Sequence, residues 1–297
     1  MTEKLDEIVE VIAKRVSARL QEMGITPKFA VASCVGGGDC VNCGLCVVKK
    51  PEAVNNIVSF GATRIGASAG INAQIDTKLA GMIDHTLLKP DATREELLKI
   101  CNEAKKYNFA TVCVNSCNIP LVARELRGTP VKAIAVVGFP LGAATTQAKV
   151  FESQEAIKAG AEEIDMVINL GALKSKDYRA VYEDIRQVVT ASKPHKVKVI
   201  IETSMLNADQ KIVACALSKT AGAAFVKTST GFGGGGATAE DIALMRRIVG
   251  DDMEVKASGG IRTKEDAEKM VKAGADRIGA SASVAIVTGK APKTSGY

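Results

Sequence analysis

From residue 82 onward, short apolar stretches alternate with longer segments in which apolar residues recur every three to four positions. The short stretches predict strands, and the helical spacing predicts amphipathic helices. The predicted strands are 82–85, 111–115, 133–137, 164–168, 198–202, 224–228, 254–257 and 277–279. The predicted helices are 93–106, 118–127, 145–159, 177–192, 208–221, 239–249, 263–272 and 282–288. Eight strand–helix units within about 210 residues are typical of a (β/α)8 TIM barrel, an α/β fold.

A doubly wound open sheet is the alternative arrangement of alternating strands and helices. The near-equal length of the repeats and the lack of an early Gly-x-Gly-x-x-Gly turn favour the closed barrel. We therefore predict a TIM-barrel domain over residues 72–297, preceded by an N-terminal helical and loop extension over residues 1–71.

The extension contains a helical pattern, a loop and a repeat of a later segment. Residues 3–23 have helical spacing, and residues 33–46 have no periodicity. Residues 61–69 (GATRIGASA) match residues 274–282 (GADRIGASA), which include the eighth predicted strand, at eight of nine positions. We favour the interpretation that the first copy lies outside the barrel. The alternative is a strand exchange within or between protomers.

Composition narrows the classes of partner. Apolar residues make up 46% of the chain and charged residues 24%, as in ordinary globular proteins. The net charge of +6 favours anionic ligands. Aromatic residues are only 4% and the basic residues are scattered, which does not indicate a nucleic-acid partner. Because neither a signal peptide nor an apolar run of roughly 20 residues is evident, we expect a cytoplasmic protein without a membrane partner. We also expect a homo-oligomer, a dimer.

Four of the eight cysteines lie close together in the extension, spaced as Cys34-x5-Cys40-x2-Cys43-x2-Cys46. Four thiolates can bind one metal ion tetrahedrally, so we hypothesise a zinc or Fe–S site. Redox-sensitive thiols and no role at all are the alternatives. The other four cysteines lie within apolar patterns, where buried packing is the usual role.

The chemically most informative stretch is residues 223–236 (AAFVKTSTGFGGGG). An apolar run ends at Lys227, hydroxyl residues including Thr228 follow, and a glycine-rich segment comes next. Burial disfavours the charge of a lysine and lowers its pKa, which makes it an amine nucleophile. Glycine amides can approach an anion closely. One loop therefore offers a carbonyl-attacking amine and a phosphate cradle.

Lys256 lies on the strand after Lys227, and Asp165 lies on the fourth predicted strand. Two ammonium groups about 5 Å apart repel by roughly 3 kcal/mol at an effective dielectric constant near 20. We therefore expect the lysine in the drier position to be neutral near pH 7, with Asp165 handling protons. Each residue taken alone has a simpler interpretation: a lysine at a strand end usually extends its side chain towards solvent, and an aspartate inside a barrel usually caps a turn or pairs with a base.

Six motifs, in order, resemble the deoxyribose-phosphate aldolase family across residues 72–297. They are 84–90 (DHTLLKP), 111–115 (TVCVN), 137–142 (VGFPLG), 163–169 (EIDMVIN), 225–232 (FVKTSTGF) and 255–262 (VKASGGIR). The resemblance implies a class I aldolase on a TIM barrel that reversibly cleaves 2-deoxy-D-ribose 5-phosphate to D-glyceraldehyde 3-phosphate and acetaldehyde, in deoxyribose phosphate catabolism. No cofactor is needed for that catalysis.

The resemblance also implies roles for individual residues. Lys227 corresponds to the Schiff-base lysine, Lys256 to the lysine that keeps it nucleophilic, and Asp165 to the proton donor and acceptor. The implied substrate-binding residues are Asp84, Thr86, Cys113, Thr228, Gly231, Gly259, Gly260 and Ser281. The last four would hold the phosphate, and Cys113 would be a packing residue of the pocket. Phe232 stands where some family members have a lysine, which removes one cation from the phosphate site.

Two other functions remain as alternatives. One is a Schiff-base aldolase with a different donor, which the 227–231 motif disfavours. The other is a metal- or redox-responsive assembly component, which the intact Lys227, Lys256 and Asp165 disfavour.

Overall fold

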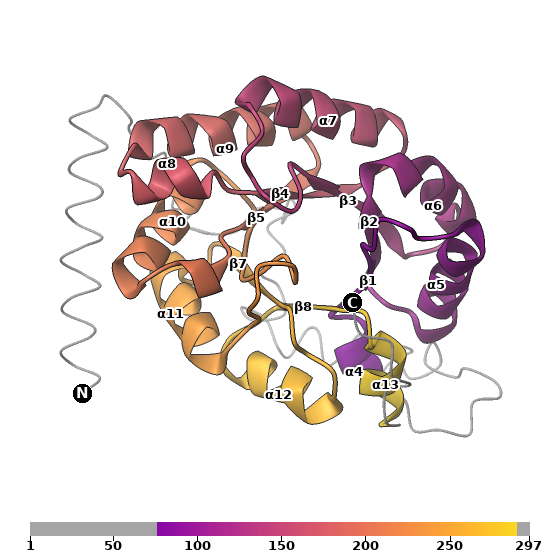
Figure 1. The fold of residues 1–297 in the computed structure, drawn as a ribbon. Coiled ribbons are helices and arrows are strands. Elements are labelled where there is room, and N and C mark those ends of the chain that lie inside the picture. Colours follow the sequence, from indigo (N-terminus) through magenta and orange to yellow (C-terminus); the bar gives the residue numbers. More distant parts are fainter. Residues whose placement is uncertain (1–75, 290–297) are drawn as a thin grey trace, which may run out of the picture. The chain divides into compact units, whose positions relative to one another are not determined.

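The computed structural model describes residues 76–289, and these residues form a closed barrel of eight parallel strands (Figure 1). Each strand pairs with the next along the chain, and β8 closes the barrel on β1. The strands are β1 (Ile83–Leu87), β2 (Thr111–Asn115), β3 (Lys132–Val137), β4 (Glu163–Val167), β5 (Lys196–Ile200), β6 (Phe225–Lys227), β7 (Glu254–Ser258) and β8 (Arg277–Ala280). The predicted (β/α)8 fold is confirmed.

Helices surround the strands, and each predicted helix is present within one or two residues of its expected bounds. They are α5 (Arg94–Tyr107), α6 (Ile119–Leu126), α7 (Thr146–Lys158), α9 (Tyr178–Ser192), α10 (Ala208–Thr220), α11 (Ala239–Val249), α12 (Lys264–Lys272) and α13 (Ser283–Thr288). Side-chain caps explain several of these starts. Thr93 and Glu96 form a capping box at α5, and the Thr238 side chain accepts from the Asp241 amide at α11.

Four short elements were not predicted. They are α4 (Thr77–Ala80), α8 (Leu170–Lys174) and the 3-10 turns η2 (Ser116–Asn118) and η3 (Thr203–Met205). Elements of three to five residues carry too few apolar positions to show a periodicity, so the pattern of the sequence could not reveal them.

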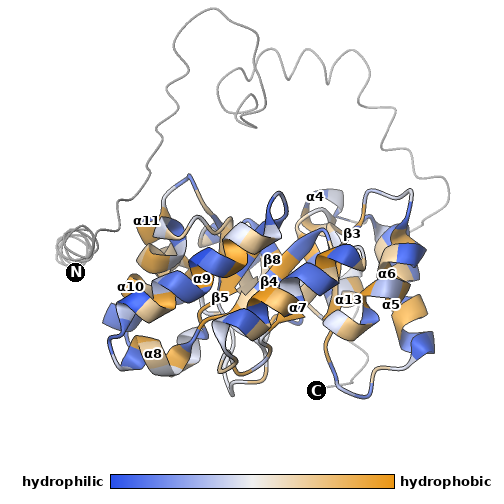
Figure 2. Cartoon of the chain, turned by 90° about the horizontal axis from the view of Figure 1, so that it is seen from above, coloured by the Kyte–Doolittle hydropathy of each residue, from blue (hydrophilic) through white to orange (hydrophobic). Residues whose placement is uncertain are grey.

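The main core lies between the strands and the helices. Apolar strand residues such as Val112, Ile164 and Val255 pack there against helix residues such as Ile185 and Met245. Each helix carries both apolar and polar residues, coloured orange and blue in Figure 2, and apolar helix residues are the ones that pack in the core. The barrel interior holds a second, smaller apolar cluster formed by Leu88, Cys113, Ile134 and Val136. The rest of the interior is available for polar groups.

The prediction for the fifth strand was wrong at both ends. Residues 198–202 were expected, whereas β5 begins at Lys196 and ends at Ile200. The chain turns at Glu202, which has a left-handed φ of 53° and precedes η3. The alternation therefore places Lys198 in the middle of the strand and Glu202 beyond it.

Within the described residues, no helix has the length and apolar character that crossing a bilayer requires. The predicted extension over residues 1–71, including the repeat of the β8 sequence and the four clustered cysteines, lies outside the described residues. The domain boundary at residue 72 and the strand-exchange hypothesis therefore remain predictions.

Candidate active site

Three buried side chains, Lys227, Lys256 and Asp165, meet inside the barrel. β6 and β7 pair in register so that Lys227 lies opposite Lys256, and both side chains point inwards. Both ammonium groups lie 2.8 Å from the same oxygen, Oδ2 of Asp165 on β4. The structure thus brings together the three residues that the sequence singled out for catalysis.

Lys256 has a second carboxylate partner. Its Nζ lies 2.6 Å from Asp84 Oδ2, and Asp84 is itself completely buried. Asp84 is held on its other side by Thr111 Oγ1 at 2.8 Å and by Arg277 at 2.7 Å. Burial by itself would raise the pKa of Asp84, but the cations of Lys256, Arg277 and Lys198 outweigh it and lower that pKa. Lys256 is therefore a fixed cation between two carboxylates.

The pKa values of the two lysines shift in opposite directions, and the reason is not the one we expected. Burial lowers the pKa of Lys227, the attraction of Asp165 opposes this, and repulsion from Lys256 adds to it. Burial also disfavours the charge of Lys256, but Asp165 and Asp84 outweigh it and raise its pKa. Lys256 is the drier of the two, at 0% exposure against 2% for Lys227. The number of carboxylate neighbours, and not dryness, thus sets the direction in which each pKa shifts.

Asp165 is the centre of this arrangement. Burial would raise the pKa of its carboxyl group, but the ammonium groups of Lys198, Lys227 and Lys256 hold it well below the ordinary value. Asp165 is therefore a carboxylate near neutral pH and is able to accept a proton from a group placed beside Lys227.

Lys198 is a third buried lysine, and the sequence reasoning did not include it in the site. It lies opposite Asp165 in the β4–β5 register, and its Nζ is 3.0 Å from Asp165 Oδ1. It also forms a short ion pair with Glu163, and Arg277 Nη1 lies 3.7 Å from the same Glu163 oxygen. The sequence did contain a signal for Lys198. In the alternating stretch KVKVI over 196–200, residue 198 lies on the same face of the strand as residue 200, which faces the barrel interior.

Three of the expected substrate-binding residues make contacts within the protein. The Thr86 hydroxyl donates to the Asp84 carbonyl at 2.9 Å. Thr228 Oγ1 donates to the Ser258 carbonyl and accepts from the Ser258 amide, so it ties β6 to β7. Cys113 is fully buried in the interior apolar cluster, where burial and the charge of Asp165 raise the pKa of its thiol to about 11. Cys113 is therefore a neutral packing group near pH 7.

The expected phosphate residues follow the last three strands. Gly231 follows β6, Gly259 and Gly260 follow β7, and Ser281 follows β8. The three glycines have φ angles of 90°, 86° and 76°, a left-handed region that side chains disfavour. Loops after the last strands of a TIM barrel are the common place for a phosphate. Phe232 is 42% exposed there, and its ring lies edge-to-face against Phe139 with centroids 5.4 Å apart.

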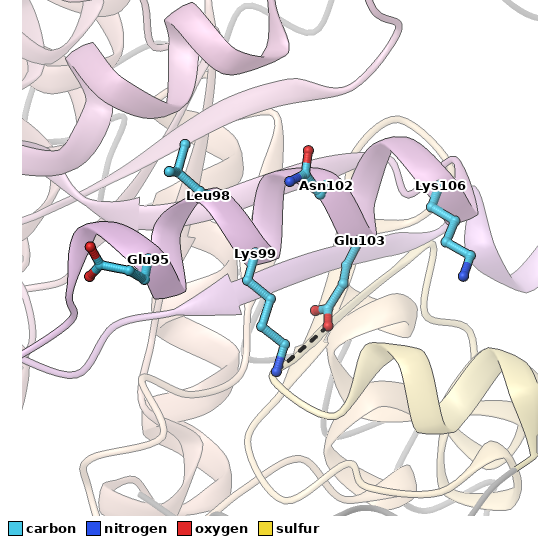
Figure 3. Close-up of a pocket in the computed structure, with 6 residues that line it drawn as sticks. All are labelled: Glu95, Leu98, Lys99, Asn102, Glu103 and Lys106. Atoms are coloured by element: carbon cyan, nitrogen blue, oxygen red, sulfur yellow. Dashed lines mark ion pairs between the residues drawn. The ribbon is translucent and has the colours of Figure 1, made fainter.

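A surface hollow of about 480 Å³ lies elsewhere, along α5 (Figure 3). It is lined by Glu95, Leu98, Lys99, Asn102, Glu103 and Lys106. One of these residues, Glu103, pairs with Nε2 of the buried His85 of β1 at 2.8 Å. None of the residues that line this hollow belongs to the cluster of Lys227, Lys256 and Asp165.

Between residues 76 and 289, no group of three or more His, Cys, Asp or Glu side chains is arranged to hold a metal ion. The hypothesised ligands Cys34, Cys40, Cys43 and Cys46 lie outside that range. The zinc or Fe–S site therefore stays a prediction.

Comparison with known proteins identifies close relatives of this chain. Residues 78–291 match the family described as DeoC/LacD family aldolase. The chain is 61% identical over 216 residues to the deoxyribose-phosphate aldolase of Clostridium novyi (strain NT), a match that covers 72% of this chain and 97% of that protein. It is also 61% identical over 210 residues to the deoxyribose-phosphate aldolase of Bacillus cytotoxicus, covering 70% and 94% of the two chains.

A solved structure shows the same fold. It is the deoxyribose phosphate aldolase of Aeropyrum pernix, described as a unique tetramer. The TM-score is 0.67 at 34% identity, and the match covers 78% of this chain and 96% of that one. The family match spans the whole barrel, from β1 to α13.

Proposed function

The chain belongs to the DeoC/LacD aldolase family, and from that premise we propose that it is a deoxyribose-phosphate aldolase. The reaction is the reversible cleavage of 2-deoxy-D-ribose 5-phosphate to D-glyceraldehyde 3-phosphate and acetaldehyde, by a class I Schiff-base mechanism. The observation that carries the proposal is the buried Lys227, whose Nζ lies 2.8 Å from a carboxylate oxygen that it shares with Lys256. Its role would be deoxyribose phosphate catabolism.

In the first step, the neutral amine of Lys227 adds to the aldehyde carbon of the open-chain sugar phosphate. Proton transfer to the carbinolamine oxygen and loss of water give an iminium ion. The iminium accepts the electron pair of the C2–C3 bond when that bond breaks, and a proton leaves the C3 hydroxyl. Glyceraldehyde 3-phosphate departs, an enamine remains on Lys227, and protonation at its carbon followed by hydrolysis releases acetaldehyde.

Asp165 and Lys256 supply the proton transfers of this scheme. The cations of Lys198 and Lys256 hold Asp165 as a carboxylate, and it touches the Lys227 nitrogen, so it can accept a proton beside the reacting carbon. Lys256 lies on the same oxygen and remains an ammonium, so it can donate a proton through Asp165. Asp84 would fix Lys256 and, with Thr86, lie near the substrate hydroxyls.

The balance of charges in the barrel interior explains why Lys227 is the amine that is neutral. Four cations (Lys198, Lys227, Lys256 and Arg277) face three carboxylates (Asp84, Asp165 and Glu163). Neutrality in this buried cluster requires the loss of one proton. Lys227 touches one carboxylate, whereas Lys198 and Lys256 each touch two. Lys198 thus belongs to the machinery as a residue that positions and polarises Asp165.

The phosphate of the substrate would bind to the amides and hydroxyl at Gly231, Gly259, Gly260 and Ser281. The left-handed glycines leave room for an anion next to the backbone, and the loops adjoin the lysine-bearing strands. Phe232 offers no cation there, so the backbone would provide most of the binding. No cofactor takes part in these steps. We further propose a cytoplasmic homo-oligomer, a dimer being the simplest form, that acts on a small phosphosugar and does not bind nucleic acid.

The activity is tested by adding 2-deoxy-D-ribose 5-phosphate to the purified full-length chain. Formation of both glyceraldehyde 3-phosphate and acetaldehyde is followed by coupled NADH oxidation with separate coupling enzymes. Equimolar release of the two aldehydes supports the proposal, and Lys227→Leu should abolish it. Release of acetaldehyde from a different sugar phosphate only would indicate a Schiff-base aldolase with another substrate.

A further inference from the structure

Glu202 is a buried carboxyl group that the mechanism above does not use. It follows β5, is only 2% exposed, and has a left-handed φ of 53° although it is not a glycine. Among the described residues, its carboxyl group accepts hydrogen bonds from Thr230 and has no lysine, arginine or histidine nitrogen within ion-pair distance. A strained backbone and a buried carboxyl group without a cation are both unfavourable, and such features concentrate at functional sites.

The side-chain hydrogen bonds of Glu202 both lead to Thr230, in the loop that follows Lys227. Its Oε2 accepts from the Thr230 amide at 3.1 Å and from the Thr230 hydroxyl through a short hydrogen bond. Thr230 Oγ1 in turn accepts from the Phe232 amide at 3.0 Å. One carboxyl oxygen therefore fixes the backbone of residues 230–232, directly or through the threonine.

The loop then passes closely over the carboxyl group. A Cβ added to Gly233 would lie 2.7 Å from Glu202 Cδ, which is closer than real Cβ atoms come to a neighbour. Glu202 Oε1 is buried and has no hydrogen-bond partner among the described residues. The loop around Gly233 thus covers the Glu202 carboxyl group, and the hydrogen bonds from Thr230 fix the loop to it.

This arrangement separates two sets of loop amides. The N–H groups of Thr230 and Phe232 are used inside the protein. The N–H groups of Gly231, Gly233 and Gly234 have no acceptor among residues 76–289, and Gly231 and Gly234 have φ angles of 90° and 77°. Gly233 and Gly234 are neighbours in sequence, and adjacent amides in a glycine-rich turn that have no acceptor within the protein can together bind an anion.

We propose that Glu202 is the positioning residue of the phosphate loop: by holding Thr230 and Phe232 inwards it presents the glycine amides to the 5-phosphate. Glu202 does not touch the substrate, and it determines how strongly the enzyme prefers a phosphorylated sugar over its unphosphorylated analogue. The inference rests on the proposed function, because it assumes that an anion binds at this loop.

The test compares 2-deoxyribose 5-phosphate with 2-deoxyribose as substrates of wild type, Glu202→Ala, Glu202→Gln and Thr230→Val. Glu202→Ala should raise KM for the phosphorylated sugar at least tenfold and change kcat less than threefold. Its kcat/KM for 2-deoxyribose should change less than threefold. Glu202→Gln keeps an acceptor oxygen for Thr230, so it should restore KM to within threefold of wild type. Thr230→Val should fall between the two, because it loses the hydroxyl and keeps the amide.

Glu152→Ala is the matched control. The Glu152 carboxylate accepts from the Gly138 amide at 2.8 Å and from the Ser116 hydroxyl at 2.8 Å, so it anchors loops that follow other strands. The control should leave the ratio of kcat/KM values for the two sugars at the wild-type value. Thermal melts of all variants show that the compared proteins are folded.

Equal losses of kcat/KM for both sugars in Glu202→Ala would overturn the proposal, and so would an unchanged KM for the phosphorylated sugar. A Glu202→Gln variant as impaired as Glu202→Ala would overturn it as well, because the acceptor oxygen would then be irrelevant. If wild type cleaves neither sugar, the proposed function fails. Calorimetric binding of inorganic phosphate to wild type and Glu202→Ala then decides the role of Glu202: at least tenfold weaker binding by the variant supports it, and equal binding or none by wild type contradicts it.

Discussion

Replacing Lys198 by methionine should make the reactive amine harder to deprotonate. Lys198 and Lys227 lie on opposite oxygens of Asp165, at 3.0 Å and 2.8 Å. Their ammonium groups are then roughly 6 Å apart, which corresponds to about 3 kcal/mol of repulsion at an effective dielectric constant near 20. Removing that repulsion raises the pKa of Lys227 by up to about two units. Because Asp165 also loses a partner and its own pKa rises, we expect a shift of about one unit or more.

The assay is the pH dependence of borohydride-trapped adduct formation with acetaldehyde, measured between pH 5.5 and 9.5. Only the neutral amine adds to the aldehyde, so the midpoint reports the pKa of Lys227. At pH values well below the wild-type midpoint the variant should trap about tenfold more slowly than wild type, and it should recover at high pH. Glu163 keeps Arg277 Nη1 at 3.7 Å in the variant, so its carboxylate retains a cation.

Lys149→Met is the control for the loss of a buried lysine. Lys149 is fully buried and pairs with Asp184 at 2.6 Å between α7 and α9, outside the barrel interior. Removing one partner of a buried pair costs about 3–5 kcal/mol, so the two variants should lose comparable stability in urea unfolding. Only Lys198→Met should move the trapping midpoint. An unchanged or lowered midpoint in a folded Lys198→Met protein would refute the charge-balance reasoning.

Four further outcomes are expected, two from the structure and two from the sequence of residues 1–71. Lys256→Leu should lower kcat by at least a hundredfold and leave a folded barrel by circular dichroism, because the cation held between Asp84 and Asp165 is lost; activity near wild type would exclude its role in proton transfer. Cys113 should resist alkylation at pH 7.5 in the native protein because its thiol has a pKa of about 11 and is buried, and Cys113→Ala should keep at least a third of kcat; rapid loss of activity with iodoacetamide that Cys113→Ala abolishes would contradict this. If the cysteine cluster is a metal site, anaerobically purified protein should contain about one metal equivalent, and Cys40→Ser and Cys43→Ser should remove it. If the repeat of the β8 sequence lies outside the barrel, deleting residues 1–71 should leave an equally stable barrel.

The fold and the centre of the site follow largely from local patterns. Apolar runs and helical spacing define the eight units, and strand-end chemistry singles out Lys227, Lys256 and Asp165. The pattern places Asp84 near the end of the first predicted strand, whereas in the structure it is the second residue of β1, where it lies buried beside Lys256.

The missed features depend on contacts between distant segments. Lys198 looks like a polar residue of a strand until the β4–β5 register places it against Asp165. The protonation of Lys227 and Lys256 depends on how many carboxylates touch each amine, which no single strand reveals. Glu202 was expected within the fifth strand, but a left-handed backbone moves it beneath a loop about thirty residues later.

Trapping with borohydride tests the central claim most directly. Full-length protein is incubated with acetaldehyde and sodium borohydride near pH 7, digested, and mapped by mass spectrometry. The account predicts one reduced ethyl adduct, on Lys227, that is absent from Lys227→Leu and is blocked by 2-deoxyribose 5-phosphate. An adduct on Lys198 or Lys256 instead, or none on any interior lysine, would contradict the assignment of Lys227 as the nucleophile.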